Sequence, residues 1–102
     1  MKLYGYYRSS ASYRVRIGLH WKGLSFESVP VHLRRGEQRM PEYLELNPQG
    51  LIPTLVDGSI VLGQSLAILE YLEERWPEPP LLPRDAAGRA RVRQLALVIA
   101  AD

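Results

Sequence analysis

Near the N-terminus, the turn Arg8–Ser10 joins a stretch with strand character to a stretch with helical spacing. Residues 2–7 are rich in Tyr and Leu, which favour a β-strand, whereas residues 11–22 contain no proline and have the spacing of a helix. A second strand is predicted over residues 26–31. This part of the chain therefore predicts a βαβ unit, in which two parallel strands are joined by a right-handed crossover.

The middle of the chain predicts a β-hairpin followed by a helix. Two apolar runs, residues 51–56 and 59–62, flank Asp57-Gly58, and this dipeptide is typical of a tight antiparallel turn. A helix over residues 65–75 follows. The order βαβ, loop, ββα predicts one mixed four-stranded sheet with helices on both faces, which is a thioredoxin-like α/β arrangement.

The connection between the two halves of the predicted sheet is polar. Residues 32–40 contain Gly and few apolar side chains, so we expect a mobile loop there. Residues 41–46 predict a short helix, because Pro41 suits the first turn of a helix.

The C-terminal part is more apolar than a lone domain requires. Four prolines between residues 77 and 83 predict a stiff linker, and a last helix is predicted over residues 86–102. Residues 95–101 are seven apolar residues in succession, and only Glu70, Glu73 and Glu74 form a polar stripe on the preceding helix. We therefore expect a second, helical domain or a partner subunit on these faces, and a chain truncated from a longer protein.

Three serines crowd the turn before the first helix. A helix N-terminus carries unpaired N–H groups and a positive dipole end, which favour an anion. A serine there usually acts only as an N-cap, but one cap needs one hydroxyl, and Ser9, Ser10 and Ser12 lie together beside Arg8. On these residues alone, a plain cap and a donor to a bound anion both stay open.

Composition excludes several classes of chemistry. The chain has no cysteine, so disulfides and thiolate metal sites are excluded, and any sulfur chemistry must come from a bound cofactor or substrate. His20 and His32 have no partner spacing for a metal site, and we expect none. The net charge of +2 is too balanced to predict nucleic-acid binding. Without a long apolar run or a signal-peptide pattern, we expect a soluble cytoplasmic protein that does not bind a membrane.

Three separated blocks resemble one known family. They are residues 8–17, with the run RSSASYRVRI, residues 46–55, with LNPQGLIPTL, and residues 64–74, with QSLAILEYLEE. Together they resemble the glutathione transferases, and within them the zeta class, which includes maleylacetoacetate and maleylpyruvate isomerases. The resemblance implies a thioredoxin-like glutathione-binding domain over residues 1–80. Residues 81–102 would be a linker and the first helix of an all-α C-terminal domain whose remainder is absent.

The resemblance also implies roles for single residues. Ser9 would donate a hydrogen bond to the glutathione sulfur, with Ser10 as the alternative and Arg8 beside them; Ala11 replaces the cysteine of the zeta signature. Gln64 and Ser65, whose alternative role is a plain N-cap, would bind the γ-glutamyl carboxylate. The implied glutathione-binding residues are Ser9, Ser10, Ala11, Arg14, Gln38, Ile52, Pro53, Gln64 and Ser65.

Three of these implied roles concern loops and arginines. Ile52-Pro53 would be a cis peptide whose Ile52 backbone pairs with the cysteinyl part of glutathione, although most X–Pro bonds are trans. Gln38 would contact the glycyl end. Arg8 and Arg14 could meet the carboxylates of a maleyl-type substrate, or Arg14 could instead pair with a glutamate.

The implied activity is a glutathione-dependent cis–trans isomerisation of a small dicarboxylate electrophile, as in aromatic amino acid catabolism, by a homodimer. It would proceed by thiolate addition to the double bond, rotation and elimination; a transferase or dehalogenase would use the same thiolate for displacement. The alternative is a non-catalytic binding or interaction module. We expect the 102-residue chain alone to be poorly active or inactive.

Overall fold

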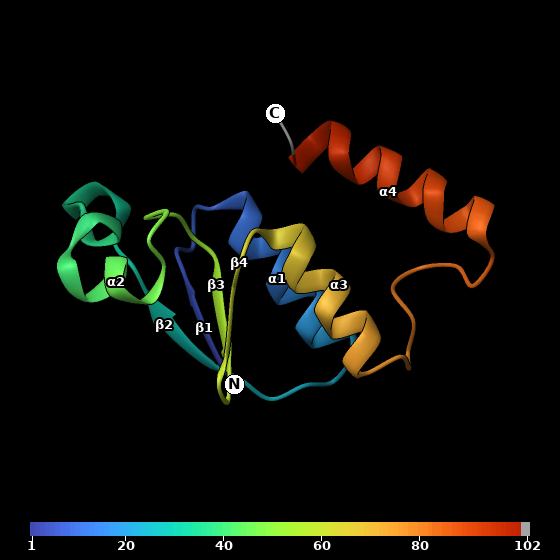
Figure 1. Cartoon of the computed structure of the whole chain (residues 1–102), viewed down its shortest axis with the longest axis horizontal. Helices are drawn as coiled ribbons and strands as arrows, with labels where there is room; N and C mark the ends of the chain where they lie inside the picture. Colours follow the sequence, from blue (N-terminus) through green and yellow to red (C-terminus); the bar gives the residue numbers. More distant parts are fainter. Residues whose placement is uncertain (101–102) are drawn as a thin grey trace.

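The computed structural model describes residues 1–100, with side chains as far as residue 98. Its four strands form one sheet in the order β2-β1-β3-β4 (Figure 1). β1 pairs in parallel with β2 and antiparallel with β3, which pairs antiparallel with β4. This confirms the predicted mixed sheet. The strand bounds are Lys2–Gly5 for β1, Glu27–Pro30 for β2, Thr54–Asp57 for β3 and Ile60–Gly63 for β4.

Helices cover both faces of this sheet, as predicted. The bounds are Ser10–Trp21 for α1, Pro41–Leu46 for α2, Ser65–Arg75 for α3 and Ala86–Ala100 for α4. α1 and α3 pack together on one face, and α2 lies on the other (Figure 1). Successive residues of a strand point to opposite faces, so Leu3 is buried in the core under α1 and α3, whereas the ring of Tyr4 lies against that of Tyr43 in α2.

The core between the sheet and the helix pair α1–α3 is aliphatic. Each of its buried members is at most 1% exposed, so the apolar faces of the strands and helices pack closely against each other. The buried members are Leu3, Val15, Leu19, Leu55, Ile68 and Leu72.

Two connections differ from the prediction. Residues 32–40, which were expected to be a loop, form two 3₁₀ turns, Leu33–Arg35 and Glu37–Arg39, joined by Gly36 at φ +72°. The carboxylate of Glu37 accepts a hydrogen bond from the N–H of His32 at 2.7 Å and so links the two ends of the first turn. Composition alone does not predict this hydrogen bond. The hairpin loop is Gly58-Ser59, one residue later than predicted, because Asp57 pairs with Ile60.

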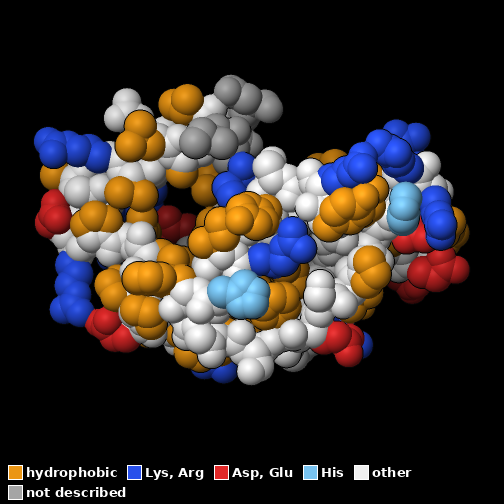
Figure 2. Space-filling model, turned by 180° about the vertical axis from the view of Figure 1, so that it is seen from behind, with side chains coloured by type: hydrophobic (Ala, Val, Ile, Leu, Met, Phe, Trp, Pro, Cys, Tyr) orange, Lys and Arg blue, Asp and Glu red, His pale blue; other side chains and the backbone are white. Residues whose placement is uncertain are grey.

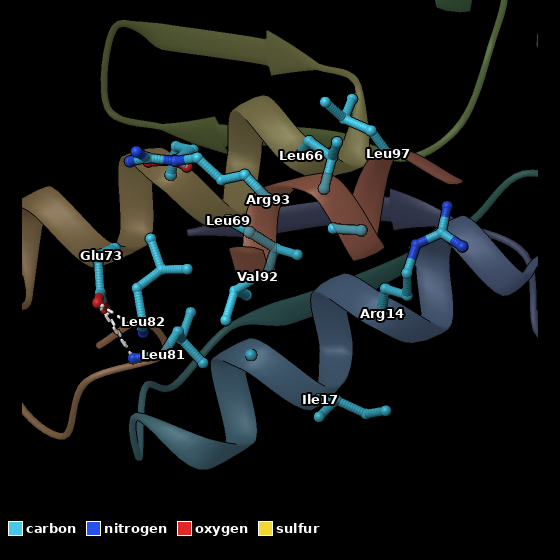
Figure 3. Close-up of a pocket in the computed structure, with 13 residues that line it drawn as sticks. Arg14, Ile17, Leu66, Leu69, Glu73, Leu81, Leu82, Val92, Arg93 and Leu97 are labelled. Atoms are coloured by element: carbon cyan, nitrogen blue, oxygen red, sulfur yellow. Dashed lines mark hydrogen bonds and ion pairs between the residues drawn. The ribbon is translucent and has the colours of Figure 1, made fainter. Parts of the chain in front are cut away.

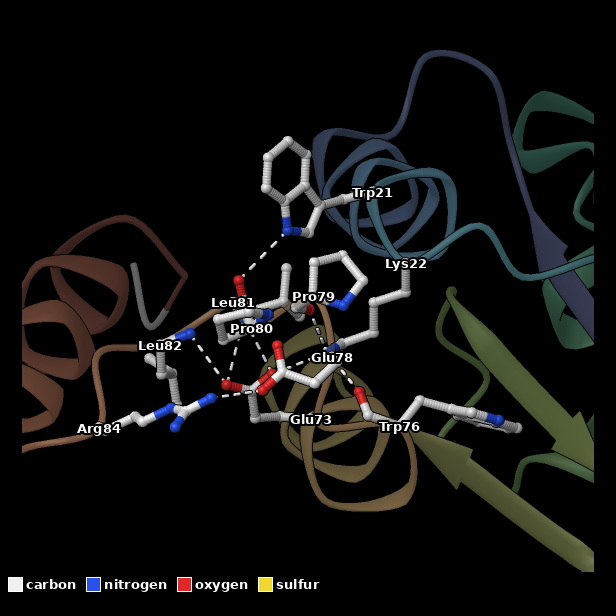
Figure 4. Close-up of polar contacts among 10 residues, drawn as sticks. All are labelled: Trp21, Lys22, Glu73, Trp76, Glu78, Pro79, Pro80, Leu81, Leu82 and Arg84. Atoms are coloured by element: carbon white, nitrogen blue, oxygen red, sulfur yellow. Dashed lines mark hydrogen bonds and ion pairs between the residues drawn. The ribbon is translucent and has the colours of Figure 1, made fainter.

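The proline-rich linker is held against the helix pair by a buried ion pair. Lys22, just past α1, donates from Nζ to Glu73 Oε1 at 2.8 Å and to the carbonyls of Trp76 and Pro79 at 2.6 and 2.9 Å (Figure 4). Glu73 therefore does not lie in an exposed polar stripe; it is 7% exposed.

A two-point ion pair between Arg93 and Glu70 joins helix α4 to α3. Arg93 donates from Nε to Glu70 of α3 at 2.7 Å. Leu95, Leu97 and Val98 are 67%, 51% and 62% exposed, as the apolar run predicted. Ala101 and Asp102, which the prediction included in this helix, lie outside the described residues, as do the side chains of residues 99 and 100. Within the described chain, no helix combines the length and apolar character that a membrane span requires.

Candidate functional site

The N-terminus of α1 separates the three serines into different roles. Ser9 is the N-cap: its Oγ accepts from the N–H of Ser12 at 3.1 Å. Ser12 is 1% exposed, and its Oγ accepts from the N–H of Tyr6 at 3.4 Å. Ser10 is exposed and makes no side-chain hydrogen bond within the described chain. Because Ser9 accepts in the cap, its own O–H remains available to donate to a ligand.

A close approach between strand and helix positions this turn. A Cβ atom on Gly5 would lie 2.8 Å from Ser12 Oγ and 3.0 Å from Ser12 Cβ. Glycine therefore lets the first turn of α1 rest directly on the end of β1. Neither residue was singled out as a positioning residue from the sequence, because the contact exists only after strand and helix have packed.

Gln64 is the N-cap residue of α3, one of the two predicted candidates, but within the described chain no side chain makes a cap hydrogen bond there. Gln64 occupies the cap position at φ +67°, but its side chain turns away and donates to Gln49 Oε1 at 3.2 Å. Ser65 is the first helical residue and is 6% exposed. The N–H groups of the first turn thus keep their capacity to bind an acceptor such as a carboxylate.

Arg14 connects the two helix N-termini. From the second turn of α1, its Nη2 donates to Ser65 Oγ at 3.3 Å. The possible pairing of Arg14 with a glutamate is not formed: the described ion pairs use Lys2, Lys22, Arg84 and Arg93 as their cations. Arg14 Nε is buried without a hydrogen-bond partner in the described chain.

The third part of the site is the loop before β3. Ile52-Pro53 is a cis peptide, which confirms the expected geometry. The Tyr43 hydroxyl lies 2.5 Å from the Leu51 carbonyl and 2.7 Å from Thr54 Oγ1, which also accepts from the Asn47 amide at 2.9 Å. The sequence near Asn47 indicated a turn, but it did not predict that Tyr43, Asn47 and Thr54 hold this loop by hydrogen bonds.

The same chain of hydrogen bonds has an electrostatic consequence. Burial of the Tyr43 hydroxyl raises its pKa, and hydrogen bonds from Thr54 and Asn47 only partly oppose this. Tyr43 therefore stays neutral and can donate to the Leu51 carbonyl throughout the neutral range. The backbone of Ile52, one residue later, makes none of the turn or loop hydrogen bonds of the described chain.

Two predicted site residues are placed less directly. Gln38 lies beside the turn at Gly50, where an added Cβ would lie 3.2 Å from the Gln38 carbonyl oxygen. Its side-chain Oε1 is buried without a partner in the described chain. Arg8 is exposed, and its guanidinium lies over the ring of Tyr7 at 5.5 Å.

A separate apolar cavity of about 400 Å³ lies between α1, α3 and α4 (Figure 3). Its walls include Ile17, Leu69 and Val92, and Arg14 also contributes to its lining. From behind, the molecule is hollowed beneath α4, with apolar side chains around the opening (Figure 2). This cavity adjoins the polar site at Arg14 rather than enclosing the serine turn.

These groups fit a ligand that carries carboxylates and peptide groups. In the part of the chain that the structure describes, two helix N-termini offer N–H donors, Ser9 and Ser65 offer hydroxyl donors, and the positive charge of Arg14 pairs with no carboxylate. Among the described residues, no group of three or more acidic, His or Cys side chains could hold a metal ion.

Comparison with known proteins gives consistent similarities. Residues 3–80 match the family model of the glutathione S-transferase N-terminal domain. The chain is 57% identical over 105 residues to maleylacetoacetate isomerase of Pseudomonas aeruginosa, covering 100% of this chain and 50% of that protein. It is 52% identical over 102 residues to a zeta-class glutathione S-transferase of Euphorbia esula, covering 100% of this chain and 45% of that protein.

A solved structure extends this similarity to the fold. Maleylacetoacetate isomerase of Methylobacterium extorquens AM1, with bound malonate and glutathione, matches with a TM-score of 0.97 and 50% identity. The match covers 100% of this chain and 48% of that one. This chain thus spans about half the length of the relatives it matches.

Proposed function

Because this chain belongs to the glutathione S-transferase family, through the N-terminal domain that residues 3–80 match, we propose that it is the glutathione-binding part of a zeta-type, glutathione-dependent isomerase. Residues 1–80 are the glutathione-binding domain in this proposal. Residues 81–102 are the linker and first helix of a helical domain. The observation that carries it is the hydrogen bond from Arg14 to Ser65, which joins two helix N-termini with free N–H groups.

The residues of this chain divide the binding task. Ser65 and the free N–H groups of α3 bind the γ-glutamyl carboxylate, with Gln64 beside them. The backbone of Ile52 pairs with the cysteinyl part as an added strand would, next to the cis bond to Pro53. Gln38 lies toward the glycyl end.

Glutathione supplies, when bound, the thiolate nucleophile that a cysteine-free chain lacks. A free thiol has a pKa near 8.5 and is mostly protonated at neutral pH. Ser9 donates its free O–H to the sulfur, and the N-terminus of α1, with the N–H groups of Ser10 and Ala11, stabilises the negative charge. Such a hydrogen bond to a charged group is worth about 1.5–3 kcal/mol, which lowers the pKa of the thiol by about one to two.

The electrophile in this proposal is a small unsaturated dicarboxylate of the maleyl type. Arg8 is exposed beside the serine turn and has no acidic partner among the described ion pairs, so its guanidinium can bind a substrate carboxylate. A homodimer and a cytoplasmic location, where glutathione is kept reduced, belong to the same proposal.

The test is calorimetric titration of glutathione into the chain, with the pKa of the bound thiol followed by thiolate absorbance. Ser9→Gly removes the hydroxyl while costing only a few tenths of a kcal/mol at an N-cap. We expect it to raise the pKa of the bound thiol by about one to two. Ser10→Ala is the matched control and should leave that pKa unchanged.

The outcomes separate the roles. If the pKa of the bound thiol rises only in Ser10→Ala, Ser10 rather than Ser9 donates to the sulfur. If that pKa changes in neither variant, the serine hydroxyls of this turn do not activate the thiol. Isomerisation of maleylacetoacetate and maleylpyruvate, assayed with a helical domain like that of the relatives joined to the chain, then tests the reaction itself.

A non-catalytic interaction module is the second candidate function. The exposed apolar side chains Leu95, Leu97 and Val98 favour it, because such a surface binds another protein surface. Absence of glutathione binding, together with a stable complex through α4, would support this alternative.

A further inference from the structure

The partly buried Arg14 guanidinium has an unusual charge environment. Its neighbours around the apolar cavity include two carboxylates, Glu70 and Glu73, but each is already bound by another cation. Glu73 pairs with Lys22 and Glu70 with Arg93. Within the described chain, Arg14 therefore has one hydrogen bond, to the hydroxyl of Ser65, and no counter-charge. A partly buried cation without a partner is costly unless a ligand supplies the anion.

The direction of the hydrogen bond between Arg14 and Ser65 is set by chemistry. A guanidinium has only donors, so Ser65 Oγ must be the acceptor at 3.3 Å. The single O–H hydrogen of Ser65 is consequently left to donate elsewhere. Ser65 begins α3, whose first-turn N–H groups are not capped by any side chain that the structure describes, so an acceptor placed at this end meets the hydroxyl and the N–H groups together.

We propose that Arg14 is a positioning residue for the carboxylate of the γ-glutamyl group. Arg14 donates to Ser65 Oγ, so the O–H of Ser65 points away from Arg14 and toward the carboxylate. The positive charge of Arg14 also lies next to that hydroxyl and favours the bound anion. This inference rests on the proposed binding of glutathione and adds a specificity determinant to it. Arg14 acts through Ser65, so its effect depends on the ligand having that carboxylate.

The experiment compares two peptides by calorimetry. One is glutathione, and the other is 4-aminobutanoyl-Cys-Gly, which lacks only the γ-glutamyl α-carboxylate. Arg14→Met should weaken the binding of glutathione about ten-fold or more, as expected for loss of a charge-assisted hydrogen bond. The affinity for the second peptide should be nearly unchanged. The measured quantity is the ratio of the two dissociation constants.

Arg16→Met is the matched control. Arg16 lies on the same helix, and its guanidinium lies over the ring of Tyr13 at 5.8 Å rather than against Ser65. Its removal should leave the ratio unchanged. Arg14→Lys should restore part of the ratio, because an ammonium group is also a pure donor with positive charge.

A double-mutant cycle adds an independent readout. Ser65→Ala and Arg14→Met should not be additive for glutathione, because Arg14 has no hydroxyl to position once Ser65 is gone. Equal weakening of both peptides by Arg14→Met, or additive losses in the cycle, would overturn the inference while the proposed function stands. Binding of neither peptide by the unaltered chain would overturn both.

If Arg14→Met does not fold, Arg14→Lys tests the same coupling in the Ser65→Ala background. There the lysine substitution should cause no further change in the ratio. A further loss would contradict the positioning role.

Discussion

Lys22 Nζ lies 2.8 Å from Glu73 Oε1, and both side chains are buried, at 0% and 8% exposure. Lys22 uses its three donors on Glu73 and two linker carbonyls, while Glu73 also accepts from the N–H groups of Leu81 and Leu82. The pair thus ties the end of α1, the last turn of α3 and residues 76–82 together (Figure 4). It fixes where the linker leaves the domain, and so where α4 begins.

Removing one partner of this ion pair should be strongly destabilising. Glu73→Gln leaves Lys22 buried without a counter-charge, and we expect a loss of about 3–5 kcal/mol in the free energy of unfolding. Urea denaturation measures it. Glu74→Gln, at the exposed neighbouring position, is the control and should stay within about 0.5 kcal/mol of the unaltered chain. Similar small effects in both variants would contradict the role of the pair.

The contribution of Glu73 should depend on pH in a defined direction. Burial opposes its ionisation, but hydrogen bonds from Lys22, Leu81 and Leu82, with the Lys22 charge, outweigh burial and lower the pKa of Glu73 below its ordinary value. A lowered pKa in the folded state gives stability that is complete above the unfolded-state pKa and is lost as pH falls through the folded-state pKa. The stability difference between the unaltered chain and Glu73→Gln should therefore shrink on acidification. If this stability difference instead grew as the pH fell, it would contradict a lowered pKa of Glu73 in the folded state.

The contact between Gly5 and Ser12 predicts an effect on both stability and binding. Gly5→Ala places a methyl group 2.8 Å from Ser12 Oγ, so the first turn of α1 must move, at about 1–3 kcal/mol. We expect weaker glutathione binding, because Ser9 moves with that turn. Gly18→Ala is the control: its Cβ would lie 2.6 Å from Cδ2 of Leu69, the end of a flexible side chain, with Leu81 and Leu72 at ordinary contact distance, so Ser9 should not move and glutathione affinity should be retained. Titration and urea denaturation of both variants provide the measurements.

The hydroxyl of Tyr43 predicts a link between α2 and the ligand loop. Tyr43→Phe removes the donor to the Leu51 carbonyl, and we expect a loss of about 1–3 kcal/mol in stability together with weaker glutathione binding. Tyr4→Phe is the control, because the Tyr4 ring packs on Tyr43 while its hydroxyl makes no hydrogen bond within the described chain. Unchanged affinity in Tyr43→Phe would show that the Ile52 backbone is held by other means.

The exposed face of α4 predicts self-association of the chain. Leu95 and Val98 are 67% and 62% exposed, and their burial between copies would remove apolar surface from water. Sedimentation velocity over a concentration series should show association that Leu95→Lys with Val98→Lys reduces. A strictly monomeric chain at high concentration would refute this.

Local patterns in the sequence were sufficient for the order and type of the strands and helices. α2 matches its predicted range, and α1 and α3 match closely, because periodicity, proline placement and turn dipeptides act over a few residues. The family resemblance added the cis geometry of Ile52-Pro53, which base frequencies alone would not favour. The local patterns did not predict the two 3₁₀ turns of residues 32–40, because these turns depend on the conformation of Gly36 and on one hydrogen bond to Glu37.

Tertiary packing decided which polar groups are satisfied by the protein and which are left for a ligand. The sequence alone could not tell that Ser9 is the cap, that Ser12 is buried, or that Gln64 turns away from its own helix. Arg14 bonds Ser65 and Lys22 bonds Glu73, each across 51 residues of sequence, so neither pairing is visible in local periodicity. The physical reason is that a hydrogen bond or an ion pair depends on distance in space, and only packing of α1 against α3 brings these groups within reach.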